Sequence, residues 1–290
     1  MIEPVQLRAR GLVFDALAAG PASGELVVLL HGFPQTSACW TRVLEALGAA
    51  GYRAVAPHQR GYSPKARPNT VHAYRMSQLV ADVVAISDRL DAARVHLVGH
   101  DWGGAVAWSL AGRHPERVAT LTAVSTPHPR ALTRALTWGT QPLRSAYIPV
   151  FRTPWLPELL LGARRQLGMR CLLAGSGLGP EWVEAYTRAL AQPDALSAAL
   201  AWYRAATPFS MRVPHVRAPT LYVWGSRDPA LGARAATTTA RWVTGAYRFE
   251  VLAGAGHWLP EHHPEELGRL LLEHVRAFGP PASRHAGRAR

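Results

Sequence analysis

The stretch from Val95 to Gly104 limits the folds open to this chain more than any other. Its first half is an apolar run that ends at Gly99, and apolar residues with helical spacing resume after Gly104. This pattern predicts a strand, a tight turn and a helix, with Asp101 at the tip of the turn. Glycines on both sides of the tip let backbone segments approach closely, which favours a nucleophile over a simple helix cap.

Apolar runs before and after this stretch predict an alternation of strands and helices. We expect strands near residues 5–10, 12–17, 26–30, 53–56, 95–99, 118–124, 220–224 and 247–252. Helices are expected near residues 40–50, 76–90, 104–113, 230–242 and 264–278. Such alternation indicates a mostly parallel sheet with helices on both faces.

Residues 128–214 break this alternation, because they contain helical segments interrupted by many prolines and glycines and no convincing strand. We therefore predict a helical cap at 128–214, inserted into a core domain made of residues 1–127 and 215–279. A cap over the carboxyl ends of the strands would wall a ligand pocket. Residues 280–290 are predicted to be a basic, disordered tail.

Two polar residues follow the last two predicted strands. Asp228 comes after residues 220–224, and His257 comes after residues 247–252. Carboxyl ends of parallel strands meet at one edge of a sheet, so both residues can converge on Asp101. The chain order nucleophile, acid, histidine predicts a catalytic triad.

Composition excludes several classes of protein. The net charge of +13 comes from dispersed arginines and one lysine, without a nucleic-acid-binding motif, so no nucleic-acid partner is expected. No apolar run reaches the length of a membrane span, and the N-terminus lacks a signal-peptide pattern, so we expect a cytoplasmic protein without a membrane partner. Cys39 and Cys171 are far apart and apolar in context, which favours free thiols.

A metal site has one candidate cluster in the sequence, His262, His263, Glu265 and Glu266. Its spacing fits the charged start of a helix better, since Pro264 suits a first turn and acids there face the positive end of the helix dipole. We expect no metal.

Four motifs resemble the α/β-hydrolase superfamily from about Val5 to Phe278: His31-Gly32-Phe33-Pro34, Gly99-His100-Asp101-Trp102-Gly103-Gly104, the Asp228 loop and the His257 loop. An aspartate at the tip is similar to epoxide hydrolases and dehalogenases. Two tyrosines of the cap resemble those of epoxide hydrolases. Tyr147 precedes a Phe-x-x-Pro element, and Tyr203 stands in a Trp-Tyr-Arg segment.

The resemblance implies an α/β-hydrolase fold and an epoxide hydrolase that needs no cofactor. Asp101 would form an alkyl ester with the epoxide, and His257, oriented by Asp228, would activate water to hydrolyse it. Tyr147 and Tyr203 would stabilise the oxygen of the opening ring, and the backbone N–H groups of Phe33 and Trp102 would form the oxyanion hole. Pro149 opposes this placement of Tyr147, because a proline can turn the local helix.

The wealth of tryptophan predicts a pocket for an aromatic or bulky apolar epoxide. The expected pocket walls are His31, Pro34, Trp40, Phe151, Trp155 and Trp258. The arginines of the cap would also favour a carboxylated substrate, although a solvated outer face explains most of them.

Two alternatives remain open. A hydrolytic dehalogenase would share Asp101, His257 and the acid, but Phe33 offers no side-chain donor for a halide. A non-catalytic ligand-binding homologue would keep the scaffold without turnover. Kinetics on epoxides and haloacids would separate the three readings, and a homodimer is compatible with each.

Overall fold

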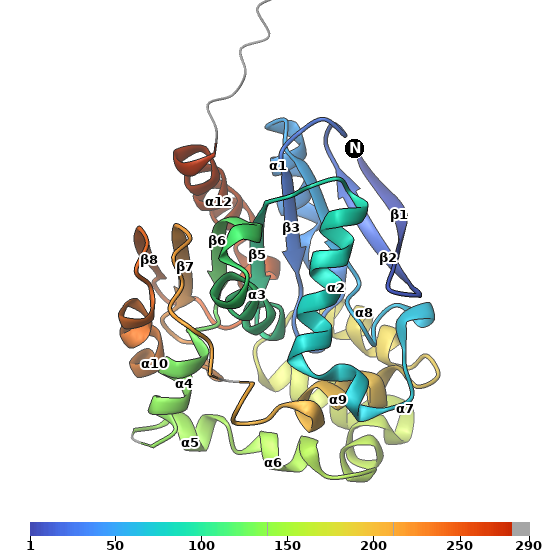
Figure 1. The fold of residues 1–290 in the computed structure, drawn as a ribbon. Helices are drawn as coiled ribbons and strands as arrows, with labels where there is room; N and C mark the ends of the chain where they lie inside the picture. Colours follow the sequence, from blue (N-terminus) through green and yellow to red (C-terminus); the bar gives the residue numbers. More distant parts are fainter. Residues whose placement is uncertain (138, 211, 280–290) are drawn as a thin grey trace, which may run out of the picture.

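The computed structural model describes residues 1–137, 139–210 and 212–279. Eight strands form one sheet in the order β1-β2-β4-β3-β5-β6-β7-β8 (Figure 1). The first two strands pair antiparallel, as do β2 and β4, and the remaining pairs are parallel. The strands are β1 (Ile2–Ala9), β2 (Leu12–Ala19), β3 (Leu26–Leu30), β4 (Arg53–Pro57), β5 (Val95–His100), β6 (Val118–Val124), β7 (Thr220–Gly225) and β8 (Tyr247–Leu252).

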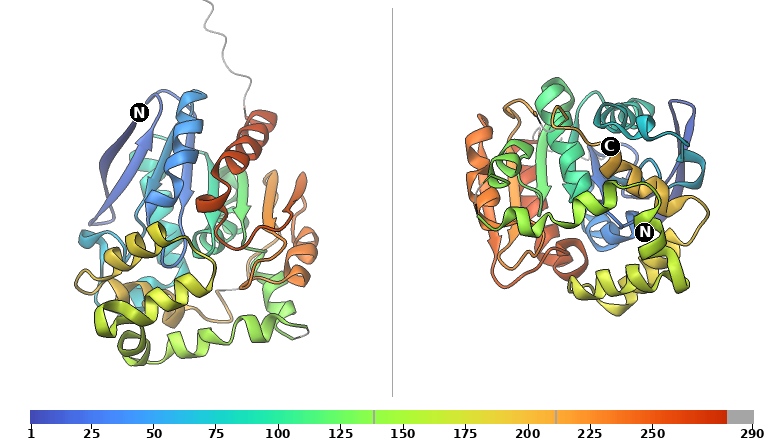
Figure 2. Two further views of the ribbon diagram at one scale, coloured as in Figure 1. Left: turned by 180° about the vertical axis from the view of Figure 1, so that it is seen from behind. Right: turned by 90° about the horizontal axis from the view of Figure 1, so that it is seen from below.

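Helices cover both faces of this sheet. One face carries α2 (Met76–Arg89) and α3 (Trp102–Arg113), and the other carries α1 (Thr41–Ala49) and α12 (Pro264–Phe278) (Figures 1 and 2). Two short helices, α10 (Ala233–Thr238) and α11 (Leu259–His262), follow β7 and β8. The predicted α/β-hydrolase fold is confirmed. The predicted tail, residues 280–290, lies outside the described residues.

The central strands are apolar on both sides because each side packs against helices. In β3, Val28 and Leu30 belong to the core beneath α2 and α3, whereas Val27 and Leu29 belong to the core beneath α1 and α12. All four side chains are fully buried. Successive side chains of a strand point to opposite faces, so an uninterrupted apolar run is the expected signature of a sheet covered twice.

A helical segment, called the insertion below, joins β6 to β7 and lies against the carboxyl ends of the strands (Figures 1 and 2). It contains no strand in its described residues, as the sequence predicts. Trp202 ties it to the core by donating its indole N–H to the Arg60 carbonyl, at 2.9 Å. The helices are α4 (Pro129–Ala135), α5 (Gln141–Arg144), α6 (Tyr147–Arg152), α7 (Leu156–Gly175), α8 (Pro180–Leu190) and α9 (Ala195–Ala205).

Three local details differ from the expectation. The helix predicted over 230–242 is α10 followed by a 3₁₀ turn, Thr239–Trp242. The strand β1 begins earlier than predicted, because it pairs along the full length of β2. The helix α7 is interrupted at Ala163–Gln166, where the backbone leaves helical geometry. No helix in the described parts of the chain combines the length and apolar character needed to cross a bilayer.

The junction of β3 and α3 yields a test of the fold. A Cβ atom at Gly103 would lie 2.2 Å from the Leu30 carbonyl oxygen, which backbone cannot accommodate. Gly103→Ala should therefore lower the free energy of unfolding by about 3 kcal/mol. Gly175→Ala, where an added Cβ meets nothing within 4 Å, is the control and should change it by less than about 0.5 kcal/mol. Urea unfolding measures both, and equal midpoints would contradict the packing described here.

Candidate active site

The turn between β5 and α3 holds Asp101 in a strained conformation. Its backbone has φ 49° and ψ −121°, which side-chain-bearing residues rarely adopt. The Asp101 carbonyl accepts hydrogen bonds from the Ala105 N–H, at 3.1 Å, and the Thr126 hydroxyl, at 2.8 Å. The backbone of Gly32 lies so close to Asp101 that a Cβ atom at position 32 would be 2.3 Å from the Asp101 Cβ. The predicted strand, turn and helix are present at these residues.

Backbone N–H groups receive the Asp101 carboxylate. The Phe33 N–H donates to Oδ1 at 2.8 Å, and the Trp102 N–H also bonds the side chain. Burial raises the pKa of Asp101, and the His257 charge and these N–H bonds only partly offset it. Oδ2 is the oxygen that faces His257, at 3.7 Å from Nε2. One carboxylate oxygen is thus held by backbone while the other faces the imidazole.

Asp228 and His257 form a buried pair behind Asp101. His257 Nδ1 lies 2.8 Å from Asp228 Oδ2, and Asp228 Oδ1 accepts the N–H groups of Ala230 and Leu231 at 2.8 and 2.9 Å. Burial by itself lowers the pKa of His257, but the charges of Asp228 and Asp101 outweigh it and raise the pKa to about 9. The carboxylate therefore orients the ring and stabilises its protonated form.

The two tyrosines of the insertion lie across from Asp101. Tyr147 begins α6 and Tyr203 belongs to α9, and their ring centroids are 6.2 Å apart. Burial raises the pKa of both phenols, and the nearby Asp101 charge raises it further, so both are proton donors at neutral pH. Pro149 falls in the first turn of α6, where a proline is tolerated, and it leaves Tyr147 beside Tyr203.

Two cavities meet at these side chains. The larger is about 430 Å³ and the smaller about 110 Å³, and Asp101, Tyr147 and Tyr203 line both. Apolar residues of the larger cavity include Ala105, Leu132, Leu136, Ile148, Pro208 and Leu231. The walls of the smaller cavity include Phe33, Pro34, Phe151, Leu172, Leu173, His257 and Trp258. Sequence reasoning missed most of these aliphatic walls, because nothing in their local pattern marks them as facing a cavity.

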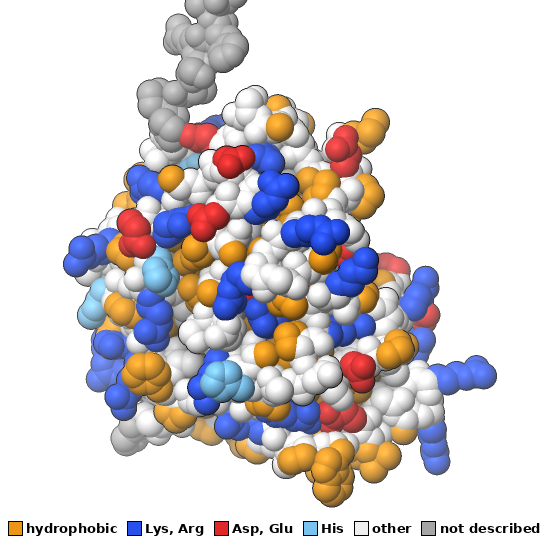
Figure 3. Space-filling view, turned by 45° about the vertical axis from the view of Figure 1, so that its right-hand side comes forward, with side chains coloured by type: hydrophobic (Ala, Val, Ile, Leu, Met, Phe, Trp, Pro, Cys, Tyr) orange, Lys and Arg blue, Asp and Glu red, His pale blue; other side chains and the backbone are white. Residues whose placement is uncertain are grey.

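The predicted pocket walls divide into two groups. Pro34, Phe151 and Trp258 line the smaller cavity. Trp155 was wrongly predicted, because it is 78% exposed and lines neither cavity. Figure 3 shows hydrophobic side chains gathered at the lower end of the molecule, where the insertion lies. Trp40 was also wrongly predicted. It is fully buried among the core residues against α1 and lines neither cavity.

His31 is a support residue and not a wall. It lines neither cavity, is fully buried, and its Nε2 accepts the Gln59 N–H at 3.1 Å. Burial lowers the pKa of His31 to about 3, so its ring is neutral. Its prediction as a pocket residue is wrong because the motif that contains it turns its side chain toward the loop after β4.

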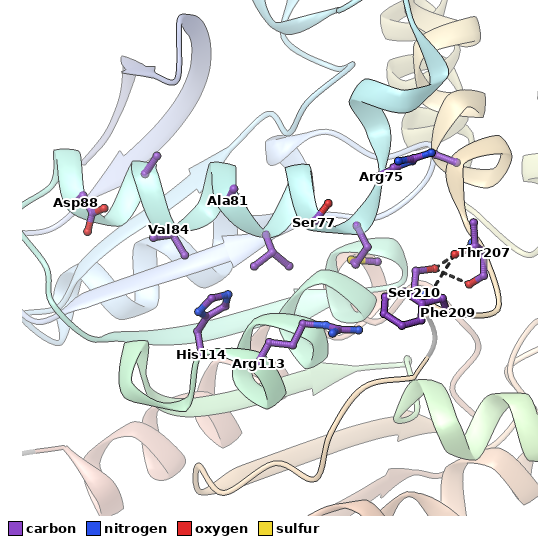
Figure 4. Close-up of a pocket in the computed structure, with 14 residues that line it drawn as sticks. Arg75, Ser77, Ala81, Val84, Asp88, Arg113, His114, Thr207, Phe209 and Ser210 are labelled. Atoms are coloured by element: carbon purple, nitrogen blue, oxygen red, sulfur yellow. Dashed lines mark hydrogen bonds between the residues drawn. The ribbon is translucent and has the colours of Figure 1, made fainter.

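Other candidate sites do not join this centre. No metal-binding group of His, Cys, Asp or Glu occurs within the described residues, and this includes His262, His263, Glu265 and Glu266. A separate cavity of about 620 Å³ lies between α2, the end of α3 and residues 205–210 (Figure 4). Its walls include Arg75, Arg113 and His114, and it contains none of the predicted site residues.

Comparison with known proteins places this geometry in a family. Residues 25–264 match a family model described as alpha/beta hydrolase fold. The AB hydrolase superfamily protein YfhM of Bacillus subtilis is 34% identical, over 93% of this chain and 96% of that protein. Epoxide hydrolase A of Mycobacterium tuberculosis is 32% identical, over 91% of this chain and 94% of that protein. The chain belongs to the epoxide hydrolase family of α/β hydrolases.

A solved structure supports the same assignment. The crystal structure of Epoxide Hydrolase A from Mycobacterium thermoresistibile superimposes with a TM-score of 0.82 at 27% identity, covering 95% of this chain and 98% of that one. The similarity therefore spans the sheet and the insertion alike, and membership of the family rests on nearly the whole chain.

Because His257 is paired with the Asp228 carboxylate, we predict an unusually high pKa for its imidazole. His257 should titrate near pH 9, and Asp228→Asn should lower its pKa by removing the charge that stabilises the imidazolium. Because the folded-state pKa is raised above 6.5, the stability that the charged ring contributes is complete below pH 6.5 and is lost as the pH rises to about 9. Imidazole NMR and urea unfolding across this range measure both effects.

Asp88→Asn is the control for this titration, since Asp88 is an exposed carboxylate paired with Arg117. It should leave the His257 titration unchanged. A His257 that titrates below pH 7 and does not respond to Asp228→Asn would contradict the role given to the pair.

Proposed function

We propose that this chain hydrolyses epoxides to vicinal diols through a covalent ester on Asp101. The observation that carries the proposal is the placement of Tyr147 and Tyr203 in the same two cavities as the Asp101 carboxylate. Ring opening needs a nucleophile on carbon and a proton donor on oxygen, and these groups are on opposite elements of one site. The family membership and the names of the relatives are consistent with this activity.

In the first half-reaction, Asp101 Oδ2 attacks an epoxide carbon and the carbon–oxygen bond of the ring breaks. Oδ2 is the suitable nucleophile because Oδ1 is held by the Phe33 N–H. Negative charge develops on the departing oxygen, where Tyr147 and Tyr203 stabilise it by hydrogen bonding and one of them supplies a proton. The product of this step is a hydroxyalkyl ester of Asp101.

In the second half-reaction, His257 Nε2 removes a proton from water and the resulting hydroxide attacks the ester carbonyl carbon. The carbonyl oxygen is then Oδ1, which already accepts the Phe33 N–H, so the oxyanion is stabilised without rearrangement. Collapse of the tetrahedral intermediate breaks the bond between the carbonyl carbon and the ester oxygen, and the imidazolium returns its proton to this departing oxygen, so that the diol is released. The new carboxyl group gives its proton to the tyrosinate left by the first step, which restores the Asp101 carboxylate and the tyrosine. Asp228 stabilises the transient imidazolium through its bond to Nδ1.

The cavities favour an uncharged substrate with one large and one small substituent. The large cavity accepts a bulky apolar group, and the small one accepts a compact group beside His257. Among the described residues, Arg152 is the one arginine or lysine that lines either cavity, and its guanidinium donates to the carbonyls of Tyr203 and Ala206 at 3.0 and 2.7 Å. A carboxylated substrate, which the arginine content favoured, therefore gains no free partner there.

Substitution of the three reacting side chains tests the function. On a panel of aryl and alkyl epoxides, Asp101→Asn should abolish diol formation. Tyr147→Phe and Tyr203→Phe should each slow epoxide opening by about 10²–10³-fold, because each removes a preplaced donor. Chiral chromatography of the diol provides the measurement.

Tyr52→Phe is the matched control, because Tyr52 is partly buried, packs against the core and lines neither cavity, so turnover should be unchanged. Full activity of both Tyr147→Phe and Tyr203→Phe would contradict the roles given to the two tyrosines. Halide release from a haloacid without epoxide turnover would favour the dehalogenase alternative.

A further inference from the structure

Glu261, in α11, is a buried carboxylate that the mechanism above does not use. Its Oε1 accepts two hydrogen bonds, from Gln35 Nε2 at 2.7 Å and from the Tyr186 hydroxyl at 2.6 Å. Its Oε2 is buried and has no hydrogen-bond partner among the described residues. An unsatisfied buried carboxylate oxygen costs free energy, so packing alone gives no reason for a glutamate at this position.

Gln35 connects Glu261 to the strand that carries the nucleophile. The Gly32 N–H donates to Gln35 Oε1 at 2.7 Å, which fixes the amide so that its nitrogen points to Glu261. His100, the last residue of β5, has Nδ1 2.7 Å from the same Oε1. The amide thus joins the carboxylate to a fully buried imidazole.

His100 continues the chain of contacts to the backbone of His257. Its Nε2 lies 2.9 Å from the His257 carbonyl oxygen, and the Ser125 hydroxyl donates to that oxygen at 2.8 Å. The two imidazole rings have centroids 4.8 Å apart. A neutral imidazole carries one N–H, so His100 donates either to Gln35 or to the His257 carbonyl. A chain of three contacts, through Gln35 and His100, therefore connects Glu261 to His257.

We propose that Glu261 is a positioning residue for the second half-reaction. It holds His257 through Gln35 and His100, and it places a negative charge near the His257 ring. The inference rests on the proposed function, because it concerns the step in which His257 activates water. Through Tyr186 it also couples this step to the insertion, since Tyr186 belongs to α8 and Glu261 to the core.

The charges around this pair set the direction of the effect. Asp228, Asp101, His100 and Glu261 face His257. Esterification removes the charge of Asp101, so Asp228 and Glu261 are the carboxylates left to stabilise the imidazolium. Removing the Glu261 charge should therefore lower the pKa of His257 in the ester intermediate, because that charge is among the causes that raise it.

The surroundings of Glu261 explain why glutamine is the informative substitution. Tyr186, Cys39 and His257 are its titratable neighbours. Burial raises the pKa of Glu261, and the bonds from Gln35 and Tyr186 oppose this. Both donors meet Oε1, so Glu261→Gln can keep both hydrogen bonds while it removes the charge. Glu261→Leu removes both the charge and the hydrogen bonds from Gln35 and Tyr186.

Single-turnover kinetics at several pH values separate the two half-reactions. We expect Glu261→Gln to leave ester formation within about twofold of wild type and to move the acidic limb of ester hydrolysis about one pH unit lower. Glu261→Leu should in addition slow ester hydrolysis at all pH values. Glu265→Gln is the control, because Glu265 is an exposed glutamate at the start of α12, and it should change neither phase.

Tyr186→Phe is a second variant, should Glu261→Gln not fold. It removes the hydrogen bond from Tyr186 to the Glu261 carboxylate. It should also move the acidic limb of the ester-hydrolysis profile to lower pH, but by less than Glu261→Gln does. A lower melting temperature with an unmoved hydrolysis profile in the glutamine and phenylalanine variants would overturn the proposal and leave a structural role. Failure of the wild-type chain to form any ester would instead overturn the proposed function itself.

Discussion

The carboxylate of Asp101 is mostly buried after the end of β5. In the proposed reaction, the groups around it either stabilise its charge or act on the bond that it forms. Burial alone works against ionisation, and the Phe33 and Trp102 N–H groups and His257 restore part of it. A carboxylate with few favourable solvent contacts is a stronger nucleophile than one in water. The close backbone packing at Gly103 and Gly32 keeps it in place.

The insertion does more than cover the sheet, because it bonds to residues on both sides of His257. Arg144 of α5 donates to the Asp228 carbonyl at 2.6 Å, and Gln141 bonds the Ala230 carbonyl at 2.8 Å. On the other side, Tyr186 reaches Glu261. In the proposed reaction, the insertion therefore supplies the two tyrosines that act on the epoxide oxygen, and its helix α5 also holds the loop that carries Asp228.

The sequence predicts the sheet and the positions of Asp101, Asp228 and His257 because strand ends are readable from apolar runs. The residues that line the cavities are harder to predict. Trp40 and Trp155 look alike in sequence, yet one is fully buried and the other is 78% exposed, since the face that a helical residue presents depends on how its helix docks. The Gln35–Glu261 bond joins residues 226 positions apart, and no local pattern predicts such a contact.

Isotope labelling in a single turnover tests the central claim, that a carboxylate oxygen of Asp101 attacks the epoxide carbon and becomes the new oxygen of the diol. With enzyme in excess over epoxide in H₂¹⁸O, the account predicts that the first diol carries no ¹⁸O, because its new oxygen comes from Asp101 Oδ2. Mass spectrometry of the peptide that contains Asp101 should show one ¹⁸O gained from water during ester hydrolysis. A labelled diol in the first turnover, with an unlabelled Asp101, would show direct attack by water and contradict the account.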